Sequence, residues 1–107
     1  KIQLKIFNIM YEISSALYSE VADRLRGYID GKGYYSGSFE FDFEGIHCLM
    51  RLSGVIYRTR ETIFGNQTHC IEDVVPVWWE FHTFDEEGVE LLNEFSFNIL
   101  REHLKEI

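Results

Sequence analysis

The chain has 107 residues, which is the size of a single domain with an ordinary hydrophobic core. Its 18 acidic and 10 basic residues give a formal net charge of -8, which opposes binding to nucleic acid or to an anionic membrane. Hydrophobic residues make up 46% of the sequence and aromatic residues 16%, so we expect a globular domain with a largely aromatic core. We therefore treat residues 1–107 as one domain.

The first thirty residues carry apolar side chains at steps of three and four, which is the period of an amphipathic helix. These positions are Ile2, Ile6, Ile9, Ile13, Leu17, Val21, Leu25 and Tyr28. The pattern predicts a long helix that begins at about residue 4 or earlier, has Glu20 and Arg24 as an i,i+4 ion pair, and ends at Gly27 or Gly31. The start of the helix stays open, because Ile2, Leu4 and Ile6 also alternate as in a strand.

Two strands joined by a tight turn are predicted next. From Ser38 to Glu44 phenylalanines alternate with acidic residues, which indicates a strand with one buried face. The phase of this alternation changes at Glu44-Gly45, and a two-residue turn there restores it. The turn pairs Phe43 with Ile46, Phe41 with Cys48 and Phe39 with Met50 on the core face, and Asp42 with His47 on the outer face. The second strand continues to about Arg60, with a bulge or bend at Ser53-Gly54.

The third predicted strand runs from Val74 to Thr83. Its alternation assigns to the core Val75, Val77, Trp79 and Phe81, and to the outer face Val74, Pro76, Trp78, Glu80 and His82. A tight turn at Gly65-Asn66 would pair Glu80 with Arg51, His82 with Leu49, and Trp78 with Ser53. This register assumes that the strands contain no net bulge.

The last predicted element is a helix. Residues 83–86, Thr-Phe-Asp-Glu, have the form of a capping box, and a cap at Asp85 would instead let Phe84 pack on Val89. In both cases the acidic residues 85–87 lie at the positive end of the helix dipole. The buried stripe of this helix is predicted to contain Leu92, Phe95, Ile99, Leu100, His103 and Ile107.

The order of these elements predicts an α+β fold. It consists of an N-terminal helix, a three-stranded antiparallel β-meander and a C-terminal helix, with both helices on one face of the sheet. Two helices can cover one face of such a sheet but not both faces. The outer face must therefore be covered by a second copy, by another protein or by the N-terminal segment.

The outer face is the predicted binding face. Its candidate residues are Leu49, Arg51, Tyr57, Val74, Trp78, Glu80 and His82. An apolar centre with a charged rim is typical of a protein interface, and tryptophan and tyrosine are common anchors there. We expect a small acidic, non-catalytic interaction module that self-associates or binds a protein partner through this face.

Two alternative functions follow from the same residues. His47, His82, Asp42 and Glu80 could form a cluster that binds a metal or transfers protons. The acidic composition could instead imitate DNA and block a DNA-binding protein. The sequence has no nucleophile elbow, Walker loop or HExxH motif, and neighbouring strand residues such as His47 and Cys48 point to opposite faces. We therefore expect no catalytic residue, no metal and no cofactor.

The cellular location is predicted from two absences. The two cysteines do not make a disulfide framework, and no apolar run approaches the ~20 residues of a transmembrane helix. We expect a cytoplasmic protein that binds neither nucleic acid nor membrane.

Overall fold

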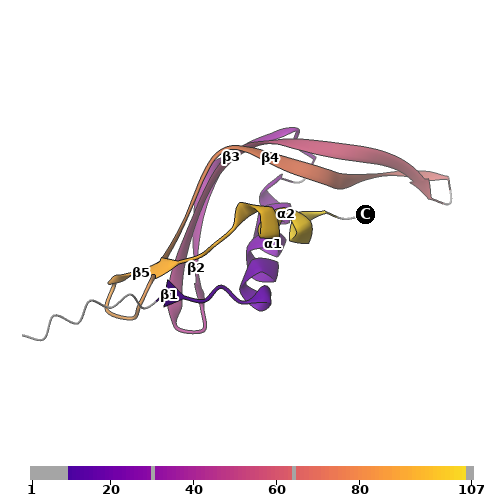
Figure 1. Ribbon diagram of the computed structural model, residues 1–107. Helices are drawn as coiled ribbons and strands as arrows, with labels where there is room; N and C mark the ends of the chain where they lie inside the picture. Colours follow the sequence, from indigo (N-terminus) through magenta and orange to yellow (C-terminus); the bar gives the residue numbers. More distant parts are fainter. Residues whose placement is uncertain (1–9, 30, 64, 106–107) are drawn as a thin grey trace, which may run out of the picture.

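A computed structural model describes residues 10–29, 31–63 and 65–105 (Figure 1). Over these described residues the fold is α+β, with two helices and one five-stranded mixed sheet. The elements are β1 (Met10–Tyr11), α1 (Ser15–Ile29), β2 (Tyr34–Phe43), β3 (Ile46–Ile63), β4 (Asn66–Phe84), β5 (Glu90–Asn93) and α2 (Phe97–Leu104). The strand order is β1-β5-β4-β3-β2, antiparallel except for the parallel pair β1 and β5. The three predicted strands correspond to β2, β3 and β4, and the two short strands β1 and β5 were not predicted.

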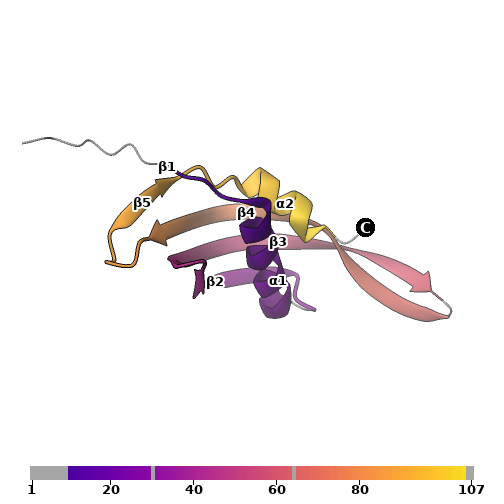
Figure 2. The same ribbon diagram turned by 90° about the horizontal axis from the view of Figure 1, so that it is seen from below.

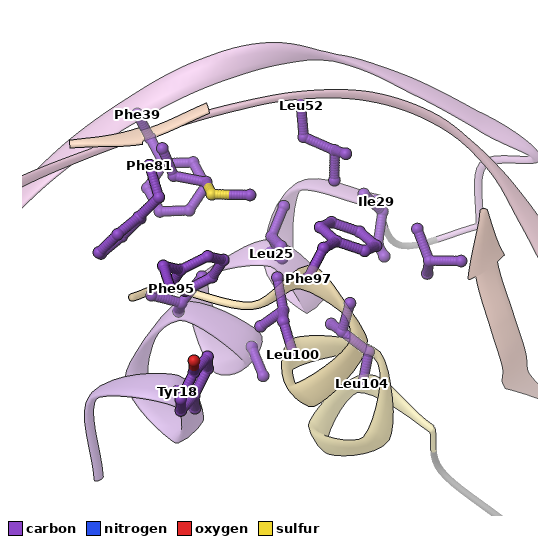
Figure 3. Close-up of a cluster of buried hydrophobic side chains, with 14 of the residues drawn as sticks. Tyr18, Leu25, Ile29, Phe39, Leu52, Phe81, Phe95, Phe97, Leu100 and Leu104 are labelled. Carbon is purple, nitrogen blue, oxygen red and sulfur yellow. The ribbon is translucent and has the colours of Figure 1, made fainter. Parts of the chain in front are cut away.

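The sheet is strongly curved, and both helices lie on its concave side (Figures 1 and 2). The core fills the space between the sheet and the two helices (Figure 3). Its fully buried side chains include Leu17, Val21 and Leu25 of α1, Met50 and Leu52 of β3, and Leu100 and Leu104 of α2. The convex side of the sheet, which faces away from the helices, is called the outer face below.

Helix α1 begins later than the sequence predicted. Met10 and Tyr11 form β1, and the helix starts at Ser15, so the prediction of a helix from residue 4 is wrong within the described residues. The hydroxyl of Ser14 accepts the N–H of Leu17 at 3.1 Å and caps the first turn. The helix continues through Gly27 and ends at Ile29, beyond which Gly31 has a φ of 73°. The predicted positions 2, 6 and 9 lie outside the described residues.

An ion pair on its surface and an arginine at its C-terminal end stabilise α1. The predicted pair of Glu20 and Arg24 is confirmed, with 2.7 Å between Oε2 and Nε. At the other end, the Arg58 guanidinium donates to the carbonyls of Ile29 at 2.6 Å and Lys32 at 3.2 Å. Because a helix ends with unpaired carbonyls at its negative pole, an arginine there is favourable. Arg58 thereby connects the end of α1 to the middle of β3.

The β2–β3 hairpin confirms the predicted register. Its pairs include Phe43 with Ile46, Phe41 with Cys48, Phe39 with Met50, and Asp42 with His47. The turn residues Glu44 and Gly45 have φ values of 49° and 82°, as a type I′ turn requires. The phenylalanines therefore face the helices and the acidic residues face outward.

The β3–β4 hairpin contains the residue pairs that the sequence predicted, but its turn lies elsewhere and its strands contain two bulges. The chain reverses between Ile63 and Asn66, one residue earlier than the predicted turn, which changes the register by two residues. Two register shifts, between Ser53 and Gly54 and between Tyr57 and Arg58, each add one residue to β4. The two bulges offset the earlier turn. As a result, the predicted pairs are present: Arg51 with Glu80, Leu49 with His82, and Ser53 with Trp78.

The bulges change which valines of β4 are buried. Val74 is only 1% exposed, whereas Val75 and Val77 are 38% and 71% exposed, so the predicted orientation of all three was wrong. Trp79 packs against the core and Trp78 is 46% exposed, as predicted. In a bulge two consecutive residues oppose one residue of the partner strand, and here both Val77 and Trp78 face outward.

The segment from residue 83 to 96 forms a turn and a strand instead of the predicted helix. The Asp85 carboxylate accepts the N–H groups of Glu87 and Val89, both at 2.9 Å, and Gly88 has a φ of 83°. These are features of a tight turn, and they end β4 and begin β5. Helix α2 starts only at Phe97, so the predicted capping box at Thr83 is wrong. Of the predicted stripe, Phe95 and Leu100 are buried, while Leu92 and Ile99 are exposed.

Candidate interaction face

The structure places the predicted binding residues on the outer face with one exception. Leu49, Arg51, Tyr57, Trp78, Glu80 and His82 belong to the outward-facing positions of β3 and β4. Val74 is buried on the helix side, and Val75 and Val77 take its place. The outer face has two parts, an apolar patch near the bulges and a charged patch that extends from the β2–β3 turn to β5.

The apolar patch spans three strands. Val55 pairs with Tyr34 of β2 and with Val75 of β4, and Ser53 in the next row pairs with Trp78. The members of the apolar patch are Tyr34, Val55, Tyr57, Val75, Val77 and Trp78. Five of them are large hydrophobic residues with at least 38% of their surface exposed, Val77 being the most exposed at 71%. An apolar patch of this kind is typical of an interaction site.

A shallow hollow borders Trp78. It is lined by Ser36, Gly37, Ser38, Arg51, Ser53 and Trp78. The hydroxyls of Ser36 and Ser53 hydrogen-bond each other at 2.7 Å across the β2–β3 pair. The flank of the indole is thus open beside small polar side chains, which leaves room for an inserted side chain.

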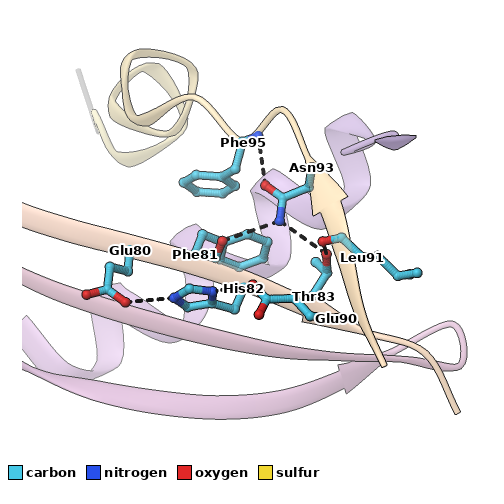
Figure 4. Close-up of polar contacts among 8 residues, drawn as sticks. All are labelled: Glu80, Phe81, His82, Thr83, Glu90, Leu91, Asn93 and Phe95. Atoms are coloured by element: carbon cyan, nitrogen blue, oxygen red, sulfur yellow. Dashed lines mark hydrogen bonds and ion pairs between the residues drawn. The ribbon is translucent and has the colours of Figure 1, made fainter. Parts of the chain in front are cut away.

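The charged patch contains two histidines, each held between two carboxylates. His47 Nδ1 lies 2.8 Å from Asp42 Oδ1, and its Nε2 lies 2.7 Å from Glu40 Oε1. His82 Nε2 lies 2.7 Å from Glu80 Oε1, and its Nδ1 lies 2.7 Å from Glu90 Oε2. Figure 4 shows His82 between β4 and β5 with its bond to Glu80.

The predicted cluster of His47, His82, Asp42 and Glu80 is therefore two separate groups. The ring of Phe84 lies between them, with its centroid 6.2 Å from that of His47 and 6.4 Å from that of His82. Both nitrogens of each imidazole already bond carboxylates. Among the described residues no group of three or more His, Cys, Asp or Glu side chains is arranged to hold a metal ion.

The carboxylates also determine the protonation of the two histidines. Hydrogen bonds to Glu40 and Asp42 raise the pKa of His47, and hydrogen bonds to Glu80 and Glu90 raise the pKa of His82. In each case a negative neighbour stabilises the imidazolium. Proton uptake by these histidines would neutralise part of the charged patch.

Glu90 reaches His82 because a partly buried polar network holds β5 on β4, and the sequence analysis predicted neither β5 nor this network. Asn93 Nδ2 donates to the carbonyl of Phe81 at 3.3 Å and to Thr83 Oγ1 at 3.1 Å, and Thr83 Oγ1 donates to the Leu91 carbonyl at 3.1 Å (Figure 4). Thr83 is completely buried. The sequence placed Thr83 both at the end of the third predicted strand and in a capping box, and the structure has the strand.

The two cysteines differ in environment. Cys48 is fully buried opposite Phe41, and burial raises the pKa of its thiol to about 11. Its neighbour His47 is on the outer face, as strand geometry predicted. Cys70 lies in the distal part of β4 and is half-buried, and both thiols are free. The His47-Cys48 dipeptide therefore does not present two ligands to one ion.

Comparison of the chain with family models, curated proteins and solved structures finds no match. Within the described part of the chain, neither helix has the length and apolar character needed to span a membrane. The function is therefore argued from the outer face itself.

Proposed function

We propose that this protein is a non-catalytic interaction module whose protein partner binds the outer face of the sheet. The observation that supports this proposal is the apolar patch around Trp78, which lies on the side of the sheet that neither described helix covers. Contact of several neighbouring valines and aromatic rings with water is unfavourable in free energy. Covering them in a complex would remove that cost.

Charge defines the surface of the partner. Four carboxylates, those of Glu40, Asp42, Glu80 and Glu90, lie beside the apolar patch and bond imidazoles. A partner with an apolar centre and a rim of lysine and arginine would complement both patches. A second copy docked by the same face would bring carboxylates against carboxylates, so we favour a basic protein over self-association through this face.

Trp78 is the proposed anchor. Its indole borders the hollow at Ser36 and Ser53, and tryptophan is the residue type most enriched among residues that dominate binding energies. Removing such an anchor costs about 2 kcal/mol or more, which is roughly a 30-fold loss of affinity. Val77 beside it supplies further apolar area.

The test is a comparison of two charge insertions at equally exposed positions. Trp78 and Ile99 are both 46% exposed, but Ile99 lies on α2. We expect Trp78→Glu to abolish co-purification of a basic partner in cells of the source organism, and Ile99→Glu to retain it. Circular dichroism checks that both variants fold. Equal recovery of the same partner by both variants would refute the proposal.

The two alternatives remain predictions. A role in proton transfer for His47 and His82 would require a substrate to displace a carboxylate from one imidazole nitrogen. Mimicry of DNA would require the acidic residues to be spaced like phosphates. Turnover with a defined substrate, or competition with DNA for a DNA-binding protein, would support them in place of the proposal above.

A further inference from the structure

We propose a second interaction site, at the free edge of β2, which accepts residues 1–6 of another copy of the chain as an added strand. Strand β2 is the last in the sheet and pairs with β3 alone among the described strands. It has ten residues, its pairing with β3 shows no register shift, and it contains neither proline nor lysine. Its charged side chains, Glu40 and Asp42, are both acidic, so they disfavour an acidic strand but not a basic one. A long, regular edge of this kind offers a template for another strand.

The β2–β3 turn determines which backbone groups the edge offers. In a two-residue hairpin the residues that flank the turn form a hydrogen-bonded pair, and such pairs then recur at every second residue. Here the flanking pair is Phe43 and Ile46, so the odd-numbered residues of β2 bond β3. The N–H and C=O groups of Ser36, Ser38, Glu40 and Asp42 therefore point to the free edge.

The side chains at this edge differ between the two faces. On the helix side, Phe39 and Phe41 are 7% and 6% exposed, and the half-exposed ring of Tyr28 stacks on Phe39 with 5.2 Å between centroids. The Arg24 guanidinium lies 4.6 Å from the centroid of Phe41. On the outer face, the side chains of Glu40 and Asp42 are 61% and 80% exposed. An added strand should therefore be apolar on one face and basic on the other.

Residues 1–6 have this pattern. They lie outside the described residues, and their sequence is Lys-Ile-Gln-Leu-Lys-Ile. In an extended strand, Ile2, Leu4 and Ile6 would share one face and Lys1, Gln3 and Lys5 the other. An antiparallel register with Leu4 opposite Phe41 puts Lys5 opposite Glu40. Opposite charges directly across two strands stabilise their pairing.

The donor must be a second copy, because β1 and β2 lie at opposite edges of the sheet. The added strand would lie beyond β2, five interstrand spacings of about 4.8 Å from β1, which is about 24 Å along the sheet. If residues 1–6 form the added strand, residues 7–9 must connect it to Met10. The four extended steps from Ile6 to Met10 span at most about 14 Å, which is too short to cross the sheet. Exchange between copies meets no such limit.

The first test is the mass of the full-length chain in sedimentation at micromolar concentration. We expect the wild type to form dimers or larger assemblies and Leu4→Lys to be monomeric, because its ammonium would face Phe41 and the Arg24 guanidinium above that ring. Gln3→Ser, on the opposite face of the same segment, should behave as the wild type. A monomeric wild type, or a Leu4→Lys variant with unchanged mass, would overturn the proposal.

A charge-reversal cycle tests the register. Lys5→Glu and Glu40→Lys are each expected to weaken self-association about 3-fold to 5-fold, and the double variant is expected to recover most of the loss. Failure of the double variant to recover would exclude the pairing of Lys5 with Glu40. Trp78→Glu should leave the mass unchanged, so this site and the proposed partner site can fail independently.

Discussion

Gly54 is the position at which a single added methyl group should disturb the β3–β4 hairpin most. A Cβ atom built on Gly54 would lie 2.9 Å from the Val75 carbonyl oxygen and 3.3 Å from Pro76 Cα. The first distance is shorter than Cβ atoms approach other atoms in folded proteins, and both neighbours are backbone atoms of β4. The bulge at Val77 therefore has to shift or open before alanine can be accommodated.

Helix α1 supplies a control for the same substitution. A Cβ on Gly27 would meet no atom within 4 Å, and Gly27 is exposed within the helix. We expect Gly54→Ala to lower the free energy of unfolding by about 1–3 kcal/mol through overpacking. Gly27→Ala should raise it by about 0.5–1 kcal/mol, because alanine favours the helical backbone. For a domain of this size each kcal/mol corresponds to about 4–8 °C in melting temperature.

Urea denaturation followed by circular dichroism and tryptophan fluorescence measures both changes. The fluorescence of Gly54→Ala should also change in the native state, since Trp78 adjoins the bulge. If Gly54→Ala is as stable as the wild type, or gains stability as Gly27→Ala does, the close approach of the two backbones does not constrain the hairpin. The account of why Val75 and Val77 face outward would then be wrong.

Three further predictions concern ionisable groups. Asp73→Asn removes an ion pair in which Arg101 of α2 makes two hydrogen bonds to the Asp73 carboxylate. We expect it to lower the free energy of unfolding by about 1 kcal/mol at neutral pH, as measured by urea titration. The difference from the wild type should vanish as the pH falls through the lowered pKa of Asp73. The raised pKa values of His47 and His82 add stability that is fully present below their ordinary value of 6.5 and is lost as the pH rises through the raised values. From about pH 6 to about pH 8 the wild type should therefore lose more stability than a His47→Gln/His82→Gln variant, and parallel profiles would contradict this. A thiol reagent at mildly alkaline pH should modify Cys70 rapidly and Cys48 only after unfolding, which mass spectrometry of the peptides can show.

The sequence by itself determined the β2–β3 hairpin and the main division of faces. Strict alternation of Phe39, Phe41 and Phe43 with acidic residues allows one orientation, and the positive φ values at Glu44-Gly45 suit one tight turn. The outward position of Trp78 could be predicted as well, since Trp78, Glu80 and His82 alternate with Trp79 and Phe81 along β4. These features depend on residues close together in the chain.

Tertiary structure decided the rest. The register shift at Ser53-Gly54 confirms the bulge or bend expected there, but the second shift, between Tyr57 and Arg58, was not predicted. No local pattern marks Val77 or Glu72 as the added residue of β4, and the first bulge depends on how closely Gly54 lets β4 approach. Residues 83–86 satisfy a helix-capping motif and a strand equally well, and pairing with β5 together with the turn at Gly88 selected the strand. Where two local structures have similar free energies, contacts with distant parts of the chain determine which one forms. Such contacts placed Val75 and Val77 beside Trp78, and Glu90 beside His82.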